Sequence, residues 1–252
     1  MLAFGGIAAL GAVLAMLAGG FVKGVVGFAL PLIALSATGS FLPYEVAVAL
    51  LIMPTLVSNL FQALRNGVAA ALGSLRRYWR LNLVLVTVMP AAAQLVVALP
   101  DAVLFGILGA AITVFGASQI AGWAPQIAPD HRNRAQVGTG LIGGFFGGIS
   151  GIWGPPVVMY LLATHVPKVE MVRAQALAFL LGSLVLVGAH LRSGVLNEVT
   201  VPMSSVLVLP ALAGLALGYK VQDRLDQERF RRLTLIVLVI AGLNLLRRAI
   251  FG

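Results

Sequence analysis

The chain of 252 residues contains no cysteine and few charged residues. Without cysteine it can form no disulfide bond, thiolate nucleophile or cysteine-based metal site. Only 10% of its residues are charged, whereas soluble domains contain about 25%. The acidic residues number 8, and the HExxH, GxSxG and P-loop patterns do not occur. We therefore expect no enzyme activity, no cofactor and no metal site.

Hydrophobic residues, in contrast, make up 60% of the chain. A transmembrane helix needs about 20 consecutive, mainly apolar residues, and the chain has several such runs. The sequence predicts an all-α integral membrane protein, multi-pass in the bacterial cytoplasmic (inner) membrane and surrounded by lipid. Its candidate helices are roughly residues 2–20, 45–64, 80–99, 102–122, 136–147, 155–164, 173–191, 199–219 and 230–250.

The formal net charge of +9 does not come from a basic patch with interleaved aromatic residues. The basic residues lie in short segments between apolar runs, for example Arg76 to Arg80 and Lys220 to Arg232. This distribution is the orientation signal of membrane proteins, whose cytoplasmic loops are enriched in Lys and Arg. We therefore expect no nucleic-acid partner.

Two glycine-rich segments, one in each half of the chain, match each other. The first begins at Gly19 and the second at Gly143, an offset of 124 residues. At this offset seven residues of the first half recur without a gap: Gly19, Gly20, Phe21, Gly24, Gly27, Pro31 and Pro43. Matching interruptions of apolar segments in the two halves of a membrane protein point to a transporter's binding site.

Loop charges indicate how these interrupted segments thread through the membrane. If each segment crosses once, the basic residues divide nine to seven between the two sides. If each turns back on itself, loops 65–80, 123–135, 165–173 and 220–232 share one side and hold 13 basic residues, against three opposite. Cytoplasmic enrichment of Lys and Arg favours the second arrangement, with both termini in the periplasm.

In that arrangement, equivalent loops of the two halves lie on opposite sides of the membrane. The sequence therefore predicts two inverted-topology repeats, each a broken glycine-rich hairpin plus four transmembrane helices. The expected boundaries are 1–122 for the first membrane repeat, 123–134 for a cytoplasmic linker and 135–252 for the second repeat.

Each glycine run is followed by proline, Pro31 in the first half and Pro155 in the second. Proline is favoured at the first position of a helix, so each break should lead into a half-helix whose N-terminus points into the bilayer. Such N-termini attract anions through free N–H groups and a partial positive charge. The alternative is that glycine and proline only permit close helix packing.

Several polar residues lie in or near these segments. Lys23 stands inside the first glycine run, where a buried lysine is costly and usually functional; a lysine that snorkels from a segment end is the alternative. Asn59 and Gln62 lie three apart on one helix face. The substrate-binding candidates are Gly20, Lys23, Gly24, Gly27, Asn59, Gln62, Gly144, Gly148, Ser150, Gly151, Trp153 and Gln175.

The two motifs resemble those of the sulfite exporter TauE/SafE family, also called the TSUP family. The first is Gly19-Gly20-x-x-x-Gly24-x-x-Gly27 with Pro31, and the second is Gly143-Gly144-x-x-x-Gly148-x-x-Gly151 with Gly154-Pro155-Pro156. The resemblance covers the whole length and implies a permease for sulfite, sulfonates or other sulfur-containing or organic anions. It fixes neither the anion nor the direction of transport, and it carries no role for Lys23.

Two classes of function follow. The favoured one is a secondary transporter of a small anion, with its site near the membrane midplane between the two glycine-rich breaks. The alternative is a non-transporting membrane subunit or assembly factor of a larger complex. Long docking loops would favour the alternative, but the longest expected loop, near 123–135, is short. The coupling ion and a homodimeric state stay open.

Overall fold

The computed structural model describes residues 6–93, 101–123, 126–150 and 152–251. These residues form helices and connecting loops, with no strand among them. The helices are α1 (Gly6–Val26), α2 (Leu30–Thr38), α3 (Tyr44–Leu64), α4 (Val68–Arg77), α5 (Trp79–Ala93), α6 (Asp101–Ile120), η3 (Pro129–His131), α7 (Arg132–Ser150), α8 (Gly154–Ala163), α9 (Lys168–Arg192), α10 (Thr200–Val206), α11 (Val208–Arg224) and α12 (Gln227–Phe251).

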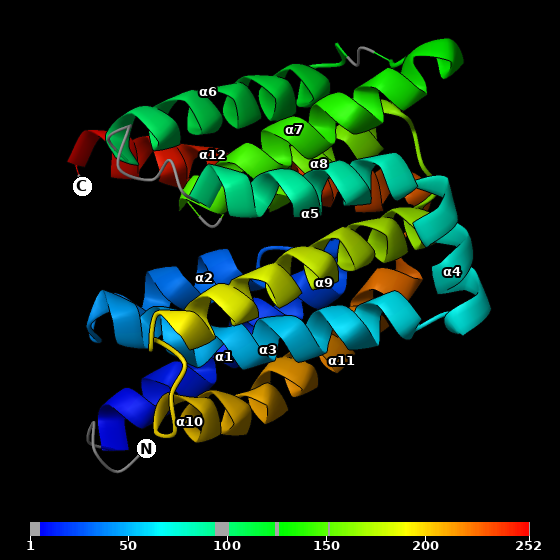
Figure 1. Ribbon diagram of the computed structural model, residues 1–252. Helices are drawn as coiled ribbons and strands as arrows, with labels where there is room; N and C mark the ends of the chain where they lie inside the picture. The colour runs from blue at the N-terminus through cyan, green and yellow to red at the C-terminus, as the bar shows by residue number, and fades with distance from the viewer. Residues whose placement is uncertain (1–5, 94–100, 124–125, 151, 252) are drawn as a thin grey trace.

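Five helical segments of the described chain are long and apolar enough to cross a membrane: Gly6–Val26, Glu45–Leu64, Lys168–Arg192, Thr200–Arg224 and Gln227–Phe251. Shorter apolar helices accompany them, and most helices lie side by side along a common direction (Figure 1). Large apolar side chains point outward all along these helices, as expected where lipid replaces water. The all-α membrane fold predicted from the sequence is confirmed.

The helices follow the same order in the two halves. In each half, a broken pair (α1 and α2, or α7 and α8) precedes four helices, of which α4 and α10 are too short to span a membrane alone. The halves are packed together in matching pairs: α1 lies against α11 as α7 lies against α5, while α6 packs on α12 and α3 on α9. The proposed domain boundaries and a symmetry relating the complete halves stay predictions.

Both broken segments turn back on themselves. A Cβ at Gly19 would lie 3.0 Å from the Leu30 carbonyl oxygen, and one at Gly11 would touch the ring of Phe41. Hence α2 runs antiparallel to α1. In the second half, the backbone N–H of Ile127, just before α7, donates to the carbonyl of Ala163 at the end of α8 (3.2 Å). The loop charges had predicted this threading.

The four basic loops meet at one end of the molecule. Arg65 pairs with Asp223 (2.7 Å), which joins the loop after α3 to the end of α11. Arg77 pairs with Glu170 (2.9 Å), which joins α4 to the start of α9. We call this end, where segments 65–80, 126–132, 163–168 and 224–227 lie, the basic end. Its assignment to the cytoplasm remains a prediction.

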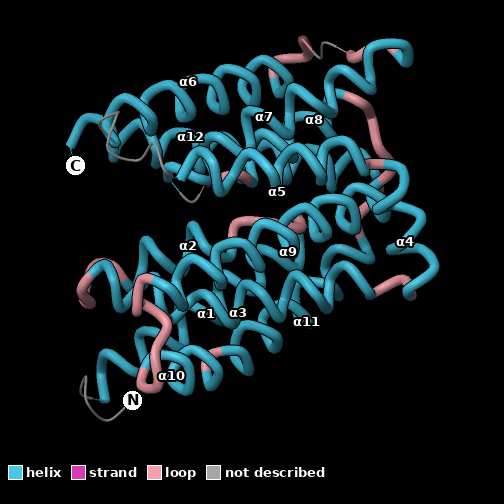
Figure 2. The backbone as a smooth tube through the Cα atoms, viewed as in Figure 1, coloured by secondary structure: helices cyan, strands magenta, loops and turns pink. Residues whose placement is uncertain are grey.

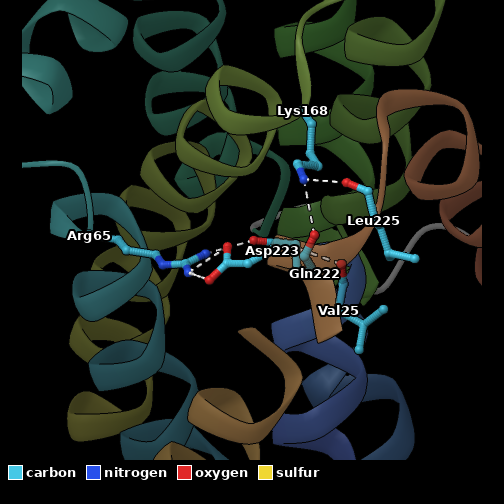
Figure 3. A network of polar contacts seen from close by, with 6 residues as sticks. All are labelled: Val25, Arg65, Lys168, Gln222, Asp223 and Leu225. Atoms are coloured by element: carbon cyan, nitrogen blue, oxygen red, sulfur yellow. Dashed lines mark hydrogen bonds and ion pairs between the residues drawn. The ribbon is translucent and has the colours of Figure 1, made fainter. Parts of the chain in front are cut away.

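Glutamine and lysine side chains tie this end together (Figure 3). Arg65 Nη1 donates to Gln222 Oε1 (2.8 Å), and Gln222 Nε2 donates to the carbonyl of Val25 (3.1 Å). Lys168 Nζ donates to the carbonyls of Gln222 (3.0 Å) and Leu225 (2.6 Å). One network therefore connects helices α1, α3, α9 and α11 at their basic ends.

The hairpins open in opposite directions. The first opens at Gly11 and Phe41, near the start of α3, and this helix of 21 residues then runs to the basic end. The second opens at the basic end itself, where α7 begins. The N-terminal end of α1 and the C-terminal end of α12 both lie at the other end of the molecule (Figure 1). Inverted repeats require this opposite orientation.

Two expectations about helix boundaries were wrong. The glycine runs are helical as far as Val26 and Ser150, so each break is confined to the few residues that follow. Segment 65–80, expected as a loop, contains α4; its alanine-rich stretch favours a helix, which lies across the end of the bundle (Figure 1). The loops of the described chain are short and most lie at the two ends (Figure 2).

The helical glycines permit a close helix crossing. A Cβ at Gly24 would lie 2.8 Å from the Gly218 Cα, and one at Gly20 would lie 3.1 Å from the Ala211 Cα. On α11, a Cβ at Gly214 would lie 2.8 Å from the backbone nitrogen of Phe21. Spacing of small residues by four on both helices lets the two backbones touch. This packing offsets the roughly 1 kcal/mol helix penalty of each glycine.

Candidate functional site

The first break places residues in left-handed backbone conformations. Gly27 has φ of 94°, and Ala29, the N-cap of α2, has φ of 81°. A side chain at Gly27 would collide with Gln175, so this position requires glycine for both its conformation and its space. Pro31 lies in the first turn of α2, as predicted.

Side-chain amides satisfy the carbonyls at the broken end of α1. Gln175 Nε2 donates to Val26 (3.1 Å), and Gln222 Nε2 donates to Val25 (3.1 Å). The last carbonyls of a helix otherwise lack partners. Gln175, a predicted substrate-binding residue, is therefore engaged through its nitrogen, while its buried Oε1 accepts no hydrogen bond.

The second break leads into α8 at Gly154, with proline in the first turn as predicted. Two predicted site residues precede this point: the side chain of Ser150 and all of Gly151 lie outside the described part of the structure. Trp153 is the N-cap of α8 and packs on α9, where a Cβ at Gly182 would lie 2.6 Å from the indole nitrogen. This nitrogen is buried and has no hydrogen-bond partner.

Lys23 is completely buried, with 1% of its surface exposed. Its ammonium donates to Oδ1 of Asn59 on α3. Asn59 Nδ2 donates in turn to Ser183 Oγ (3.1 Å) on α9, and Ser183 Oγ donates to the carbonyl of Phe179 (2.7 Å). A continuous polar chain thus runs from α1 through α3 to α9 in the interior of the bundle. The Lys23 side chain is enclosed by the bundle, which favours the functional interpretation over a lysine that snorkels from a segment end.

Gln62 lies one helical turn from Asn59 and is equally buried, with 1% exposure. Neither its nitrogen nor its oxygen has a hydrogen-bond partner. Buried amides are nearly always hydrogen-bonded, because an unpaired one costs about 1–3 kcal/mol. We call Lys23, Asn59, Gln62 and Ser183 the Lys23 group. Both polar atoms of Gln62 are thus available to a ligand.

The Lys23 group contains a positive charge and no paired negative charge. Among the described residues, the ion pairs involve only Arg65, Arg77 and Arg229, so no carboxylate neutralises Lys23. Its repeat equivalent, Gly147, faces Met89 and Trp153, and a Cβ there would lie 2.9 Å from the Trp153 Cβ. The cation is thus present in one half only, and the second half fills the corresponding space with an indole ring.

The structure brings Lys23 of α1 against Asn59 of α3, with Gln62 one helical turn further along α3. It places Gly27 against Gln175 at the nearby end of α1. It places Gly20 and Gly24 in the crossing with α11. Gly144 lies in the equivalent crossing of α7 with α5, where its Cβ would lie 2.8 Å from the Val88 Cβ. Gly148 is half-buried near the end of α7. Gly20, Gly24 and Gly144 thus permit close helix packing, and the predicted part of these four glycines in ligand binding stays a prediction.

Ser183 was missed from the sequence, although a signal for it existed. It lies 124 residues after Asn59, the same offset that relates the two glycine runs. Small hydroxyl residues are common within transmembrane helices, where they bond to carbonyls of the preceding turn. Ser183 differs from the other hydroxyl residues only because it lies opposite Asn59. That position results from the packing of α3 on α9.

The family of the chain follows from comparison with protein-family models. The model described as "Sulfite exporter TauE/SafE" matches residues 12–245. The chain belongs to this family. Comparison with curated proteins gave no match, and comparison with solved structures gave none either. TauE/SafE membership and the apolar helices make the chain a multi-pass transport protein of the inner membrane, and the family implies a transporter of sulfite or related anions.

Proposed function

We propose that the chain is a secondary transporter that moves a small sulfur-containing or organic anion, such as sulfite or a sulfonate, and binds it at the Lys23 group. The observation that carries this proposal is the fully buried Lys23, which contacts an amide oxygen and no described carboxylate. A lysine inside a membrane protein needs a compensating anion or a strong functional reason. A transported anion supplies that compensation.

Each residue of the group has a separate role in this proposal. Lys23 provides the charge, and Asn59 holds its ammonium through Oδ1. The Nε2 of Gln62 is an unpaired donor, as is the indole N–H of Trp153 beside Gly182. A buried cation and unpaired buried donors suit an oxyanion, which accepts several hydrogen bonds. The shortage of buried carboxylates suits an anion better than a cation.

Transport of this kind requires no proton relay. Export of a monovalent anion gains about 2.3 kcal/mol for each 100 mV of inside-negative potential. Inverted repeats would expose one central site to either side by a rocking motion of one half against the other. The Lys23 group bridges the two halves through the bond from Asn59 to Ser183, so it lies where such a motion would act.

A stability screen tests the proposal. The purified protein is heated in detergent with sulfite, sulfate, thiosulfate, taurine, sulfoacetate or organic carboxylates. An anion at 100 times its Kd should stabilise the fold by about 2.7 kcal/mol. We expect a stabilising anion whose effect is reduced in Lys23→Met and kept in Lys220→Met, since Lys220 is exposed. The same anion stabilising Lys23→Met as strongly as the unchanged protein would refute the proposed site.

A further inference from the structure

A second polar cavity lies at the basic end, apart from the Lys23 group. It has a volume of about 120 Å³ and lies between α4, the start of α7 and the end of α8. The residues that give it its chemistry are Arg77, Tyr78, Arg132, Gln136, Tyr160 and His165. The size suits a small oxyanion of sulfur or phosphorus with a few atoms, and none of the Lys23 group lines it.

The positive charge of this cavity comes mainly from Arg132. Arg77 is paired with Glu170 (2.9 Å), so the charges of these two residues largely cancel. The Tyr78 hydroxyl also donates to the Glu170 carboxylate (3.2 Å). Arg132 has no ion pair among the described residues, and its Nε is buried without a hydrogen-bond partner. Burial raises the pKa of Tyr78, which keeps its hydroxyl protonated.

Two carbonyls at the end of α8 accept hydrogen bonds from side chains other than Arg132. The Tyr160 carbonyl accepts from Thr164 Oγ1 (2.9 Å), and the Leu162 carbonyl accepts from Arg231 Nη1 (2.9 Å). The cavity therefore keeps an uncompensated guanidinium with a free N–H. Arg132 also stands in the first turn of α7, where the helix end adds a partial positive charge.

One buried acceptor in the cavity also lacks a partner. Gln136 Nε2 donates to the carbonyl of Arg77 (3.2 Å), which fixes the orientation of the amide. This Oε1 is buried and accepts no hydrogen bond. An anion that still carries a proton can satisfy both Arg132 and Gln136.

We propose that this cavity is a second anion site, selective for a small oxyanion with one acidic proton, such as hydrogen phosphate or hydrogen sulfite. Arg132 binds an anionic oxygen, and Gln136 Oε1 accepts the hydrogen bond of the protonated one. Sulfate carries no proton near neutral pH and leaves Gln136 unpaired, so it binds more weakly. The phosphate group of an anionic lipid shares part of this chemistry. The site does not depend on transport through the Lys23 group.

The test measures binding of radiolabelled inorganic phosphate to the purified full chain in neutral detergent. Arg132→Gln should weaken binding by about tenfold or more, as loss of a charge-assisted hydrogen bond predicts. Arg134→Gln is the matched control, because Arg134 is exposed on the same helix turn and does not line the cavity. Gln136→Leu, which removes the acceptor, should also weaken binding. Lys23→Met should keep it.

Equal loss in Arg132→Gln and Arg134→Gln would overturn the site, as would phosphate binding that Lys23→Met abolishes while the protein stays folded. Sulfite should displace the phosphate at least tenfold better than sulfate does, by the same hydrogen-bond argument; equal displacement would overturn the role of Gln136. Adding phosphatidylglycerol distinguishes a lipid headgroup from a free anion as the natural occupant. Displacement of phosphate by the lipid identifies a headgroup as the occupant, and its absence identifies the free anion.

Discussion

Asn59 Nδ2 donates to Ser183 Oγ at 3.1 Å, and the two residues are 124 positions apart in the chain. The same offset relates the two glycine runs and the prolines that follow them. A contact between equivalent positions of two repeats lies on the axis that relates them. If the halves are related by a two-fold axis, that axis passes between α3 and α9, beside Lys23.

A double-mutant cycle should detect this contact. We expect Asn59→Leu and Ser183→Ala to be non-additive in the free energy of unfolding, with a coupling of about 1 kcal/mol, because the two side chains share one hydrogen bond. Chemical or thermal denaturation in detergent provides the measurement. Ser205→Ala is a suitable control partner for Asn59→Leu, since Ser205 bonds only within its own helix (2.8 Å to Val201). Additive effects of Asn59→Leu and Ser183→Ala would show that the contact contributes nothing.

Gly24→Leu should reduce both stability and transport. A leucine there must displace the backbone of α11, because even a Cβ would lie 2.8 Å from the Gly218 Cα. The expected cost is of the order of 1–3 kcal/mol or more, the scale of overpacking in a tight core. Gly188→Leu is the control: no atom lies within 4 Å of a Cβ at Gly188. Similar stability of the two variants would contradict the role assigned to the crossing of α1 and α11. We expect Gly148→Leu to impair transport as well.

Single-cysteine labelling should place the basic end in the cytoplasm. The natural chain has no cysteine, so each introduced one is the only reactive thiol. Arg76→Cys and Arg229→Cys, both exposed at the basic end, should react only with reagents that enter the cell. Ser193→Cys, exposed at the opposite end, should react from the periplasm. Labelling of Arg76→Cys and Arg229→Cys from opposite sides would overturn the threading.

The sequence was sufficient for the parts of the fold that charge and hydrophobicity control. Long apolar runs predicted the membrane helices, and the loop charges predicted that the hairpins turn back. The charges carried this information because Lys and Arg are too costly to place at random along a membrane protein. The repeat of Pro31 and Pro155 also located the starts of the half-helices α2 and α8.

Other features depend on tertiary packing and were not predictable from local sequence. Gly20 and Gly24 suggested a backbone break, but the groove that α11 offers stabilises them inside a helix. Gln175 was predicted as a ligand contact, and this stays a prediction; its hydrogen bond to the carbonyl at the end of α1 depends on where that helix stops. Ser183 became recognisable only opposite Asn59. Lys23 was identified at once, because a lone lysine in an apolar segment is rare whatever the fold.

The most direct test of the central claim is the rate of sulfite movement across proteoliposomes that contain the unchanged protein or Lys23→Met. The proposed function predicts that the unchanged protein moves sulfite well above the rate of empty vesicles. Lys23→Met should slow this movement about tenfold or more, because it removes the charge that a buried anion needs, whereas Lys220→Met should move sulfite normally. Equal rates for Lys23→Met and the unchanged protein would contradict the account.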